Sequence, residues 1–220
     1  MPRPWLICDF DHSLVDVNTD PFVLEHSGTE GALEELRRRH AEVGQWTDTM
    51  ALSLAPLTRA AIEKALDAVT LHADMVAALR HARDEADARI VILSDANTVF
   101  IAHILAKAGL GALFDRVVSN PASWTHGEDG HEHIVVTRFH SPDAAPHGCE
   151  HCPVNLCKRL ALADVMRELD DDPAAAGEQT VIYLGDGGND WCPARDATHL
   201  LARDGMGLSR ALAKKGPPSP

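Results

Sequence analysis

Three short apolar runs stand out along the 220-residue chain, and each ends abruptly at a polar residue. Runs of about four to eight apolar residues, rich in β-branched types, are typical of strands buried on both faces of a parallel sheet. These runs predict strands at residues 5–8, 90–93 and 181–184, and a fourth strand is predicted at 116–119.

Between these runs, apolar residues recur at helical spacing. The pattern predicts helices at 74–88, 98–108 and 155–169, with Gly109 as the stop of the second. Strands that alternate with helices predict an α/β fold, namely a doubly wound, mostly parallel sheet. Ligands of such sheets lie at the carboxyl ends of the strands, where the polar residues fall here.

Residues 22–70 are periodic like helices and contain no buried-strand run. We expect a small helical cap inserted after the first strand. The predicted division is an α/β core at 1–20 and 71–212, a cap at 21–70 and a flexible tail at 213–220. A polar segment that lies between Trp124 and Cys152 holds six of the histidines.

The overall composition narrows the function classes. Apolar residues make up 45% of the chain, which is enough for a packed core, and the net charge is -13. This charge argues against nucleic acid or an anionic membrane as the main partner. No apolar run approaches the roughly 20 residues of a membrane span, and no signal peptide is predicted. The five cysteines are an odd number, which indicates a reducing compartment, so we expect a cytoplasmic protein.

Asp9 and Asp11 follow the first predicted strand and are separated by one residue. If extended geometry continues, both side chains point to the same side of the chain. A carboxylate nucleophile needs a second group that protonates the leaving oxygen and then activates water. The same spacing is also common in surface loops and simple metal sites, so the pair alone does not decide its role.

Ser94 and Asp95 come directly after the second predicted strand. A hydroxyl group and free backbone N–H groups at the start of a helix can bind phosphate. Alternatively, Ser94 or Asn97 only caps the helix that follows.

Two further features could supply charged groups to a site at this edge of the sheet. The stretch 185–190, Gly-Asp-Gly-Gly-Asn-Asp, follows the last predicted strand and can bring two acids to one cation, although surface loops have similar compositions. Lys158 lies near the start of a predicted helix. A lysine is usually solvated, but phosphoryl transfer needs a fixed cation to offset charge on the phosphate oxygens.

Four features in this order resemble the four motifs of the haloacid dehalogenase (HAD) superfamily of phosphohydrolases. They are Asp-Phe-Asp, then a strand followed by Ser94, then Lys158, and finally Gly-Asp-x-x-x-Asp. The resemblance implies that Asp9 is the nucleophile, which forms an aspartyl phosphate, and that Asp11 is the general acid and base. It implies that the phosphate is bound by Ser94, Asp95 and Lys158. It also implies an Mg²⁺ ion held by Asp9, Asp186 and the backbone carbonyl of Asp11, with Asp190 anchoring the water shell of the metal.

Five longer blocks are similar to the phosphoethanolamine/phosphocholine phosphatase family, and they lie at residues 9–20, 92–98, 119–121, 149–158 and 185–193. Members of that family include phosphatases for phosphocholine, phosphoethanolamine, pyridoxal phosphate and thiamine monophosphate. The resemblance therefore implies a small phosphorylated metabolite as substrate. His12 and Ser13 depart from the family pattern, so His12 could alter substrate preference.

The leaving group would meet the residues beyond the phosphate. Carboxylates there would suit a cationic amine, and the polar candidates are Asp16, Asn18, Asp20 and Asp95. Phe22 and Trp46 could add a cation–π wall. Asp16 and Asp20 could each equally be a solvated turn residue.

Cys149, Cys152 and Cys157 have the residue type and part of the spacing of a structural zinc site, with His140, His147 or His151 as a fourth ligand. The alternative is that reduced cysteines pack beneath the loop that presents Lys158. Two other functions stay open for the whole chain: a phosphotransferase or mutase, and a metal-binding interaction module with a vestigial phosphatase site.

Overall fold

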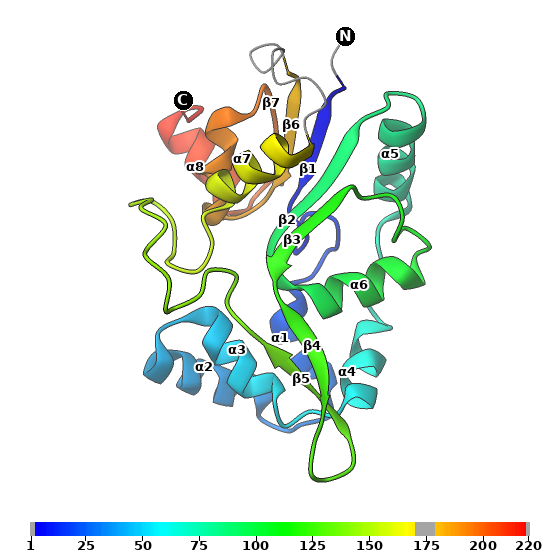
Figure 1. Cartoon of the computed structure of the whole chain (residues 1–220), viewed down its shortest axis with the longest axis vertical. Helices are drawn as coiled ribbons and strands as arrows, with labels where there is room; N and C mark the ends of the chain where they lie inside the picture. Colours follow the sequence, from blue (N-terminus) through cyan, green and yellow to red (C-terminus); the bar gives the residue numbers. More distant parts are fainter. Residues whose placement is uncertain (1–2, 170–178, 219–220) are drawn as a thin grey trace.

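The computed structural model describes residues 3–169 and 179–218. Its centre is a five-stranded sheet in the order β3-β2-β1-β6-β7, and every neighbouring pair is parallel (Figure 1). In chain order these strands are β1 (Trp5–Cys8), β2 (Arg89–Asn97), β3 (Arg116–Asn120), β6 (Val181–Gly185) and β7 (His199–Ala202). The predicted α/β class and all four predicted strands are confirmed.

The central strands are buried on both faces. Trp5 and Ile7 of β1 share one apolar cluster with residues of α7 (Lys158–Leu169). Cys8 shares the opposite cluster with residues of α5 (Ala73–Asp84) and α6 (Thr98–Lys107). Figure 1 shows α7 on one side of the sheet and α5 and α6 on the other. Burial on both faces explains why these strands read as continuous apolar runs.

The predicted helical cap lies between β1 and α5. It consists of α1 (Thr19–His26), α2 (Ala32–Val43), α3 (Trp46–Leu54) and α4 (Arg59–Leu66). The side chains of Asn18, Gln45 and Thr58 accept backbone N–H bonds at the starts of α1, α3 and α4, which explains where these helices begin.

An antiparallel hairpin, β4 (Ala122–His126) and β5 (Glu132–Val136), lies within the polar, histidine-rich region. It packs against the cap, with β5 contacting α3 and α4 (Figure 1). Ile134 and Val136 are buried in the apolar cluster that also holds cap residues. A hairpin from a later part of the chain therefore packs with the cap helices. The exact domain boundaries stay a prediction.

A further helix lies near the end of the chain. Helix α8 (Gly207–Lys215) continues three residues into the predicted tail, whose flexibility stays a prediction. Residues 219–220 of that tail lie outside the described residues. Among the helices of the described ranges, none combines the length and the apolar character needed to cross a membrane.

Candidate active site

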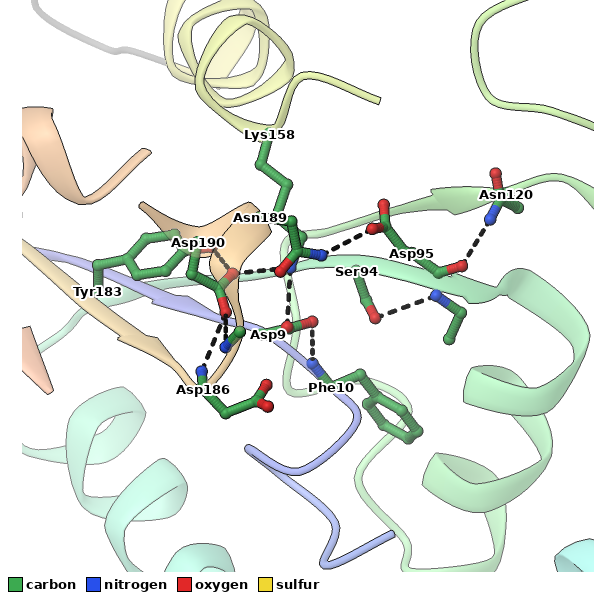
Figure 2. Close-up of polar contacts among 12 residues, drawn as sticks. Asp9, Phe10, Ser94, Asp95, Asn120, Lys158, Tyr183, Asp186, Asn189 and Asp190 are labelled. Carbon is green, nitrogen blue, oxygen red and sulfur yellow. Dashed lines mark hydrogen bonds and ion pairs between the residues drawn. The ribbon is translucent and has the colours of Figure 1, made fainter. Parts of the chain in front are cut away.

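The polar residues at the ends of three neighbouring strands meet at one edge of the sheet (Figure 2). Asp9 follows β1, Ser94 and Asp95 lie near the end of β2, and Asp186 follows β6. Lys158, the first residue of α7, points into the same place. Residues from four separate motifs are therefore brought together, as the sheet topology requires.

Lys158 is fully buried and is held between two carboxylates. Its Nζ lies 2.7 Å from Oδ2 of Asp9 and 2.8 Å from Oδ1 of Asp190. Burial alone would lower the pKa of Lys158, but the charges of Asp190 and Asp9 raise it above its usual value. The ammonium group is therefore a fixed positive charge beside Asp9.

Asp190 is completely buried and accepts four hydrogen bonds. Its Oδ1 accepts from Lys158 and from the Tyr183 hydroxyl at 2.7 Å, and its Oδ2 accepts from the backbone N–H groups of Asp186 and Gly187, both at 2.9 Å (Figure 2). Burial would raise the pKa of Asp190, but these donors hold it below its usual value.

A carboxylate has about four acceptor positions, so the hydrogen bonds of Asp190 already use its whole capacity. Asp190 therefore orients Lys158 and the loop after β6. A Cβ atom on Gly185 would lie 2.6 Å from the carboxyl carbon of Asp190, so only glycine fits there. Tyr183 could not be recognised as a site residue from the sequence, because it lies inside an apolar strand run that is typical of the core.

Asp9 and Asp186 have the donor atoms that Mg²⁺ prefers. One carboxylate oxygen from each of Asp9, Asp186 and Asp190 lies within 4.8 Å of the others. Burial raises the pKa of Asp9 well above its usual value, with Lys158 acting against this shift, and burial together with Asp190 raises the pKa of Asp186. A cation between Asp9 and Asp186 would offset this cost, and hard oxygen ligands fit Mg²⁺.

Asp11 lies apart from the Lys158 cluster, on the side of the cap. Its Oδ1 accepts the backbone N–H of Thr19 at 3.1 Å. Burial, followed by the nearby charge of Asp20, raises the pKa of Asp11 to about 7. A carboxyl group with this pKa can both give and take a proton near neutral pH.

Two asparagines hold the end of β2. The side chain of Asn189 donates to Oδ2 of Asp95 at 2.7 Å, and the side chain of Asn120 donates to the Asp95 carbonyl at 2.6 Å (Figure 2). Ser94 is buried, and its Oγ accepts the N–H of Ala96 at 3.2 Å. Asp95 therefore links β2 to the loop after β6, a role that the strand pattern could not indicate.

A cavity of about 270 Å³ opens over Asp9. Five of the residues that line it are aspartates, while none of the described lining residues is lysine or arginine. The lining consists of Asp9, Asp11, His12, Asn18, Asp20, Trp46, Ser94, Asp95, Ala96, Asp186, Gly187 and Asn189. Such a wall favours cationic groups in the cavity.

The cap supplies the far wall of this cavity. The indole Nε1 of Trp46 donates to Oδ2 of Asp20 at 2.7 Å, and the side chain of Asn18 accepts the N–H of Asp20 at 3.2 Å. Burial raises the pKa of Asp20 to about 7, with the Trp46 bond acting against this shift.

Two other candidates for contact with the leaving group lie elsewhere. Asp16 is not among the lining residues and pairs with Arg203 at 2.9 Å on the exposed surface. Phe22 stacks on His26 at 3.9 Å between ring centroids and also does not line the cavity.

The predicted zinc ligands are only partly brought together. Cys149, Cys152 and Cys157 form a group with Cys192, which the sequence-based ligand set lacked. His140 is not part of that group, and its Nε2 instead pairs with the carbonyl of Ala145 at 2.7 Å. Cys192 was missed because it is far from the other three cysteines in sequence.

Known proteins resemble most of the chain. The family model described as Putative Phosphatase matches residues 5–216. Pyridoxal phosphate phosphatase PHOSPHO2 from Homo sapiens is 28% identical, over 95% of this chain and 86% of the relative. Phosphoethanolamine/phosphocholine phosphatase from Homo sapiens is 30% identical, over 87% of this chain and 70% of the relative.

Solved structures agree in fold. A HAD family hydrolase from Salmonella enterica subsp. enterica serovar Typhi has a TM-score of 0.61 at 15% identity, covering 96% of this chain and 71% of that one. A phosphoserine phosphatase, solved as a phospho-aspartyl intermediate analogue, has a TM-score of 0.59 at 14% identity, covering 97% of this chain and 99% of that one. The chain has the fold of these HAD-type structures, and it belongs to the phosphatase family that the matching model describes.

Proposed function

We propose that this phosphatase is an Mg²⁺-dependent phosphomonoesterase that hydrolyses a small phosphorylated amine, such as phosphocholine or phosphoethanolamine, through an acyl phosphate on Asp9. One observation carries the proposal: the buried Asp9–Lys158 pair opens into a cavity whose other charged side chains are acidic. A phosphate would bind beside Lys158, and the cationic part of the substrate would face the acids.

In the first step, a carboxylate oxygen of Asp9 attacks the phosphorus atom. A bond forms between this oxygen and phosphorus, and the bond from phosphorus to the leaving oxygen breaks. Asp11 donates its proton to that leaving oxygen, and the pKa of about 7 keeps the proton available near neutral pH. Lys158 offsets the negative charge that Asp9 and the phosphoryl group bring together.

In the second step, Asp11 accepts a proton from water, and the water oxygen bonds to phosphorus. The bond between phosphorus and Asp9 breaks, which restores the carboxylate and releases inorganic phosphate. Asp11 thus serves first as the acid and then as the base.

Mg²⁺ would be held by the side chains of Asp9 and Asp186 and by the backbone carbonyl of Asp11. When bound, the ion supplies Lewis-acid polarisation of the phosphoryl oxygens. Asp190 would contribute by holding Lys158 and the loop of Asp186, because its acceptor positions are filled.

The substrate amine would contact Asp20, Asn18 and Trp46 from the cap and Asp95 from β2. An ammonium group over the Trp46 ring gains cation–π energy in addition to attraction by Asp20. Pyridoxal phosphate and thiamine monophosphate are the alternative substrates. Their aromatic rings carry nitrogen that an acid can pair with, and one similar relative is named as a pyridoxal phosphate phosphatase.

The test is release of inorganic phosphate from these four phosphomonoesters, with and without Mg²⁺. We expect Mg²⁺-dependent turnover in the wild type, with the highest kcat/KM for the amine esters, and no turnover in Asp9→Asn. Asp16→Asn is the matched control, because Asp16 lies outside the cavity, and it should match the wild type. Equal turnover in Asp9→Asn would overturn the mechanism, and a preference for pyridoxal phosphate would replace the proposed substrate class.

A further inference from the structure

Four cysteines converge outside the catalytic cavity from two separate parts of the chain. Cys149, Cys152 and Cys157 lie in the segment that leads into α7, and Cys192 follows the loop after β6. All four Sγ atoms lie within 4.8 Å of one another. The Sγ atom of Cys192 is 3.8 Å from that of Cys149 and 4.0 Å from that of Cys157.

These separations match a metal site and not a disulfide. A tetrahedral zinc ion with Zn–S bonds of about 2.3 Å places neighbouring sulfur atoms about 3.8 Å apart. A disulfide needs sulfur atoms about 2.05 Å apart, and all five cysteines are free thiols. Cys157 and Cys192 are buried, while Cys149 and Cys152 are partly exposed. A metal ion could therefore reach the group from solvent on the side of Cys149 and Cys152.

Two of the three histidines that the sequence offers as ligands, His140 and His147, have protein partners instead, and the third, His151, is not part of the group. His140 pairs with the carbonyl of Ala145, and Nε2 of His147 lies 2.9 Å from the carbonyl of Pro153. Nδ1 of His147 accepts the backbone N–H of Cys149 at 3.1 Å, so this ring positions a cysteine backbone. Four thiolates alone complete the coordination that a structural zinc ion requires.

We propose that Cys149, Cys152, Cys157 and Cys192 bind a structural Zn²⁺ ion that joins the start of α7 to the loop after β6. Lys158 directly follows Cys157, and Asp190 comes two residues before Cys192. The ion would therefore fix both partners of the buried Lys158–Asp190 pair without touching the substrate. The Arg159–Asp196 ion pair, with an N–O distance of 2.6 Å, joins the same two segments independently of any metal.

The first experiment is elemental analysis of purified full-length protein after dialysis. We expect about one equivalent of zinc per chain in the wild type and in His140→Ala, and loss of zinc in Cys192→Ser. Arg159→Gln is the structural control, since it breaks the other link between the two segments, and it should keep zinc. Zinc retained by Cys192→Ser, zinc lost from His140→Ala, or a wild-type protein that carries iron or no zinc would each overturn the proposal.

A second measurement does not depend on the folding of a cysteine variant. Wild-type protein produced with cobalt in place of zinc should show the absorption of tetrahedral thiolate-bound Co²⁺. Removal of the metal by a chelator should lower the melting temperature, and added Zn²⁺ should restore it. Absence of the thiolate absorption, or a melting temperature that does not change when the metal is removed and restored, would contradict a four-cysteine structural site.

Discussion

The two walls of the active-site cavity are built differently. The sheet wall includes Asp95, and Lys158 and Asp190 lie buried behind it without lining the cavity. Short hydrogen bonds or ion pairs tie all three residues to other core segments. On the cap wall, the Asp20 carboxylate accepts a hydrogen bond from Trp46, which lies in another cap helix. The sheet wall is a fixed arrangement of paired charges, whereas the Asp20 carboxylate on the cap wall is held, among the described residues, by the neutral Trp46 side chain.

This difference separates two tasks. Phosphoryl transfer requires charges that are already in position, because a small displacement of a catalytic group costs a large part of the rate. Recognition of the leaving group can be carried by a few contacts on a separate element, and these contacts can change without disturbing the chemistry. We therefore expect changes in the sheet wall to affect kcat and stability, and changes in the cap wall to affect KM and substrate preference.

The largest effect is expected for Lys158→Met. It leaves the buried carboxylates of Asp9 and Asp190 without their cation, which costs about 3–5 kcal/mol of unfolding free energy. Turnover should be lost at every substrate concentration. Chemical denaturation and phosphate release measure both effects, and the exposed Lys64→Met on α4 is the control. Unchanged stability in Lys158→Met would show that the sheet wall is not held by this pair.

Asp11→Asn should lower turnover by about 10²–10⁴-fold, the usual contribution of a general acid or base. Single-turnover release of the alcohol should fall strongly for phosphocholine but little for p-nitrophenyl phosphate, whose leaving group needs no proton. Equal losses for both substrates would contradict the role of Asp11 as an acid.

The same residue predicts a pH dependence. The pKa of Asp11 is raised to about 7, so the protonated form that donates to the leaving oxygen is present below about 7 and is lost as the pH rises above it. The single-turnover rate of choline release should therefore fall on the alkaline side. The rate for p-nitrophenyl phosphate should stay level, and a decline shared by both substrates would point to another group.

A smaller and more selective effect is expected for Asp20→Asn. The KM for phosphocholine should rise about tenfold, the scale for losing one contact with a charged group. Glycerol phosphate, whose leaving group is uncharged, should keep its KM. Because the charge of Asp20 contributes to the raised pKa of Asp11, the alkaline limb should also move to lower pH. Trp46→Phe is the matched variant that keeps a ring but removes the hydrogen bond to Asp20. A fall in kcat without a change in KM would contradict the proposed division of roles between the two walls.

The smallest effect concerns the link between the walls. Thr47 of α3 accepts a hydrogen bond from Asn155 at 2.9 Å, and Asn155 also donates to Asn120 at 2.8 Å. Thr47→Val should cost about 1 kcal/mol of unfolding free energy and change KM by a few-fold at most. Thr49→Val, whose hydroxyl donates within the cap to Gln45, should cost a similar stability and leave KM unchanged. A loss of kcat in Thr47→Val would show that the cap link controls the chemistry.

Much of the sheet wall could be predicted from the sequence. The strands before Asp9, Ser94 and Asp186 are central in the sheet, so burial on both faces gives each a continuous apolar run. The carboxyl ends of neighbouring parallel strands then meet at one edge, which explains why distant motifs could be placed together. Lys158 could be placed only through the family resemblance, since the helix pattern alone favours a solvated lysine.

The remaining features could not be predicted for physical reasons. Strand β7 is a short edge strand that alternates between exposed and half-buried residues, and its apolar run of three residues is shorter than the runs of the central strands. The hairpin of β4 and β5 is polar because only a few residues, such as Ile134, face the cap. Cys192 joins the other cysteines only after the chain has crossed the sheet, and no local spacing indicates that contact.

The central claim is that Asp9 becomes phosphorylated, and it can be tested directly in Asp11→Asn. That variant should slow attack by water while still accepting phosphate from p-nitrophenyl phosphate, so the phosphoenzyme should accumulate. Acid quenching, borohydride reduction and peptide mass spectrometry should find homoserine at position 9, and none in the Asp9→Asn Asp11→Asn double variant. A burst of p-nitrophenol with an unmodified Asp9, or with phosphate on another residue, would contradict the account.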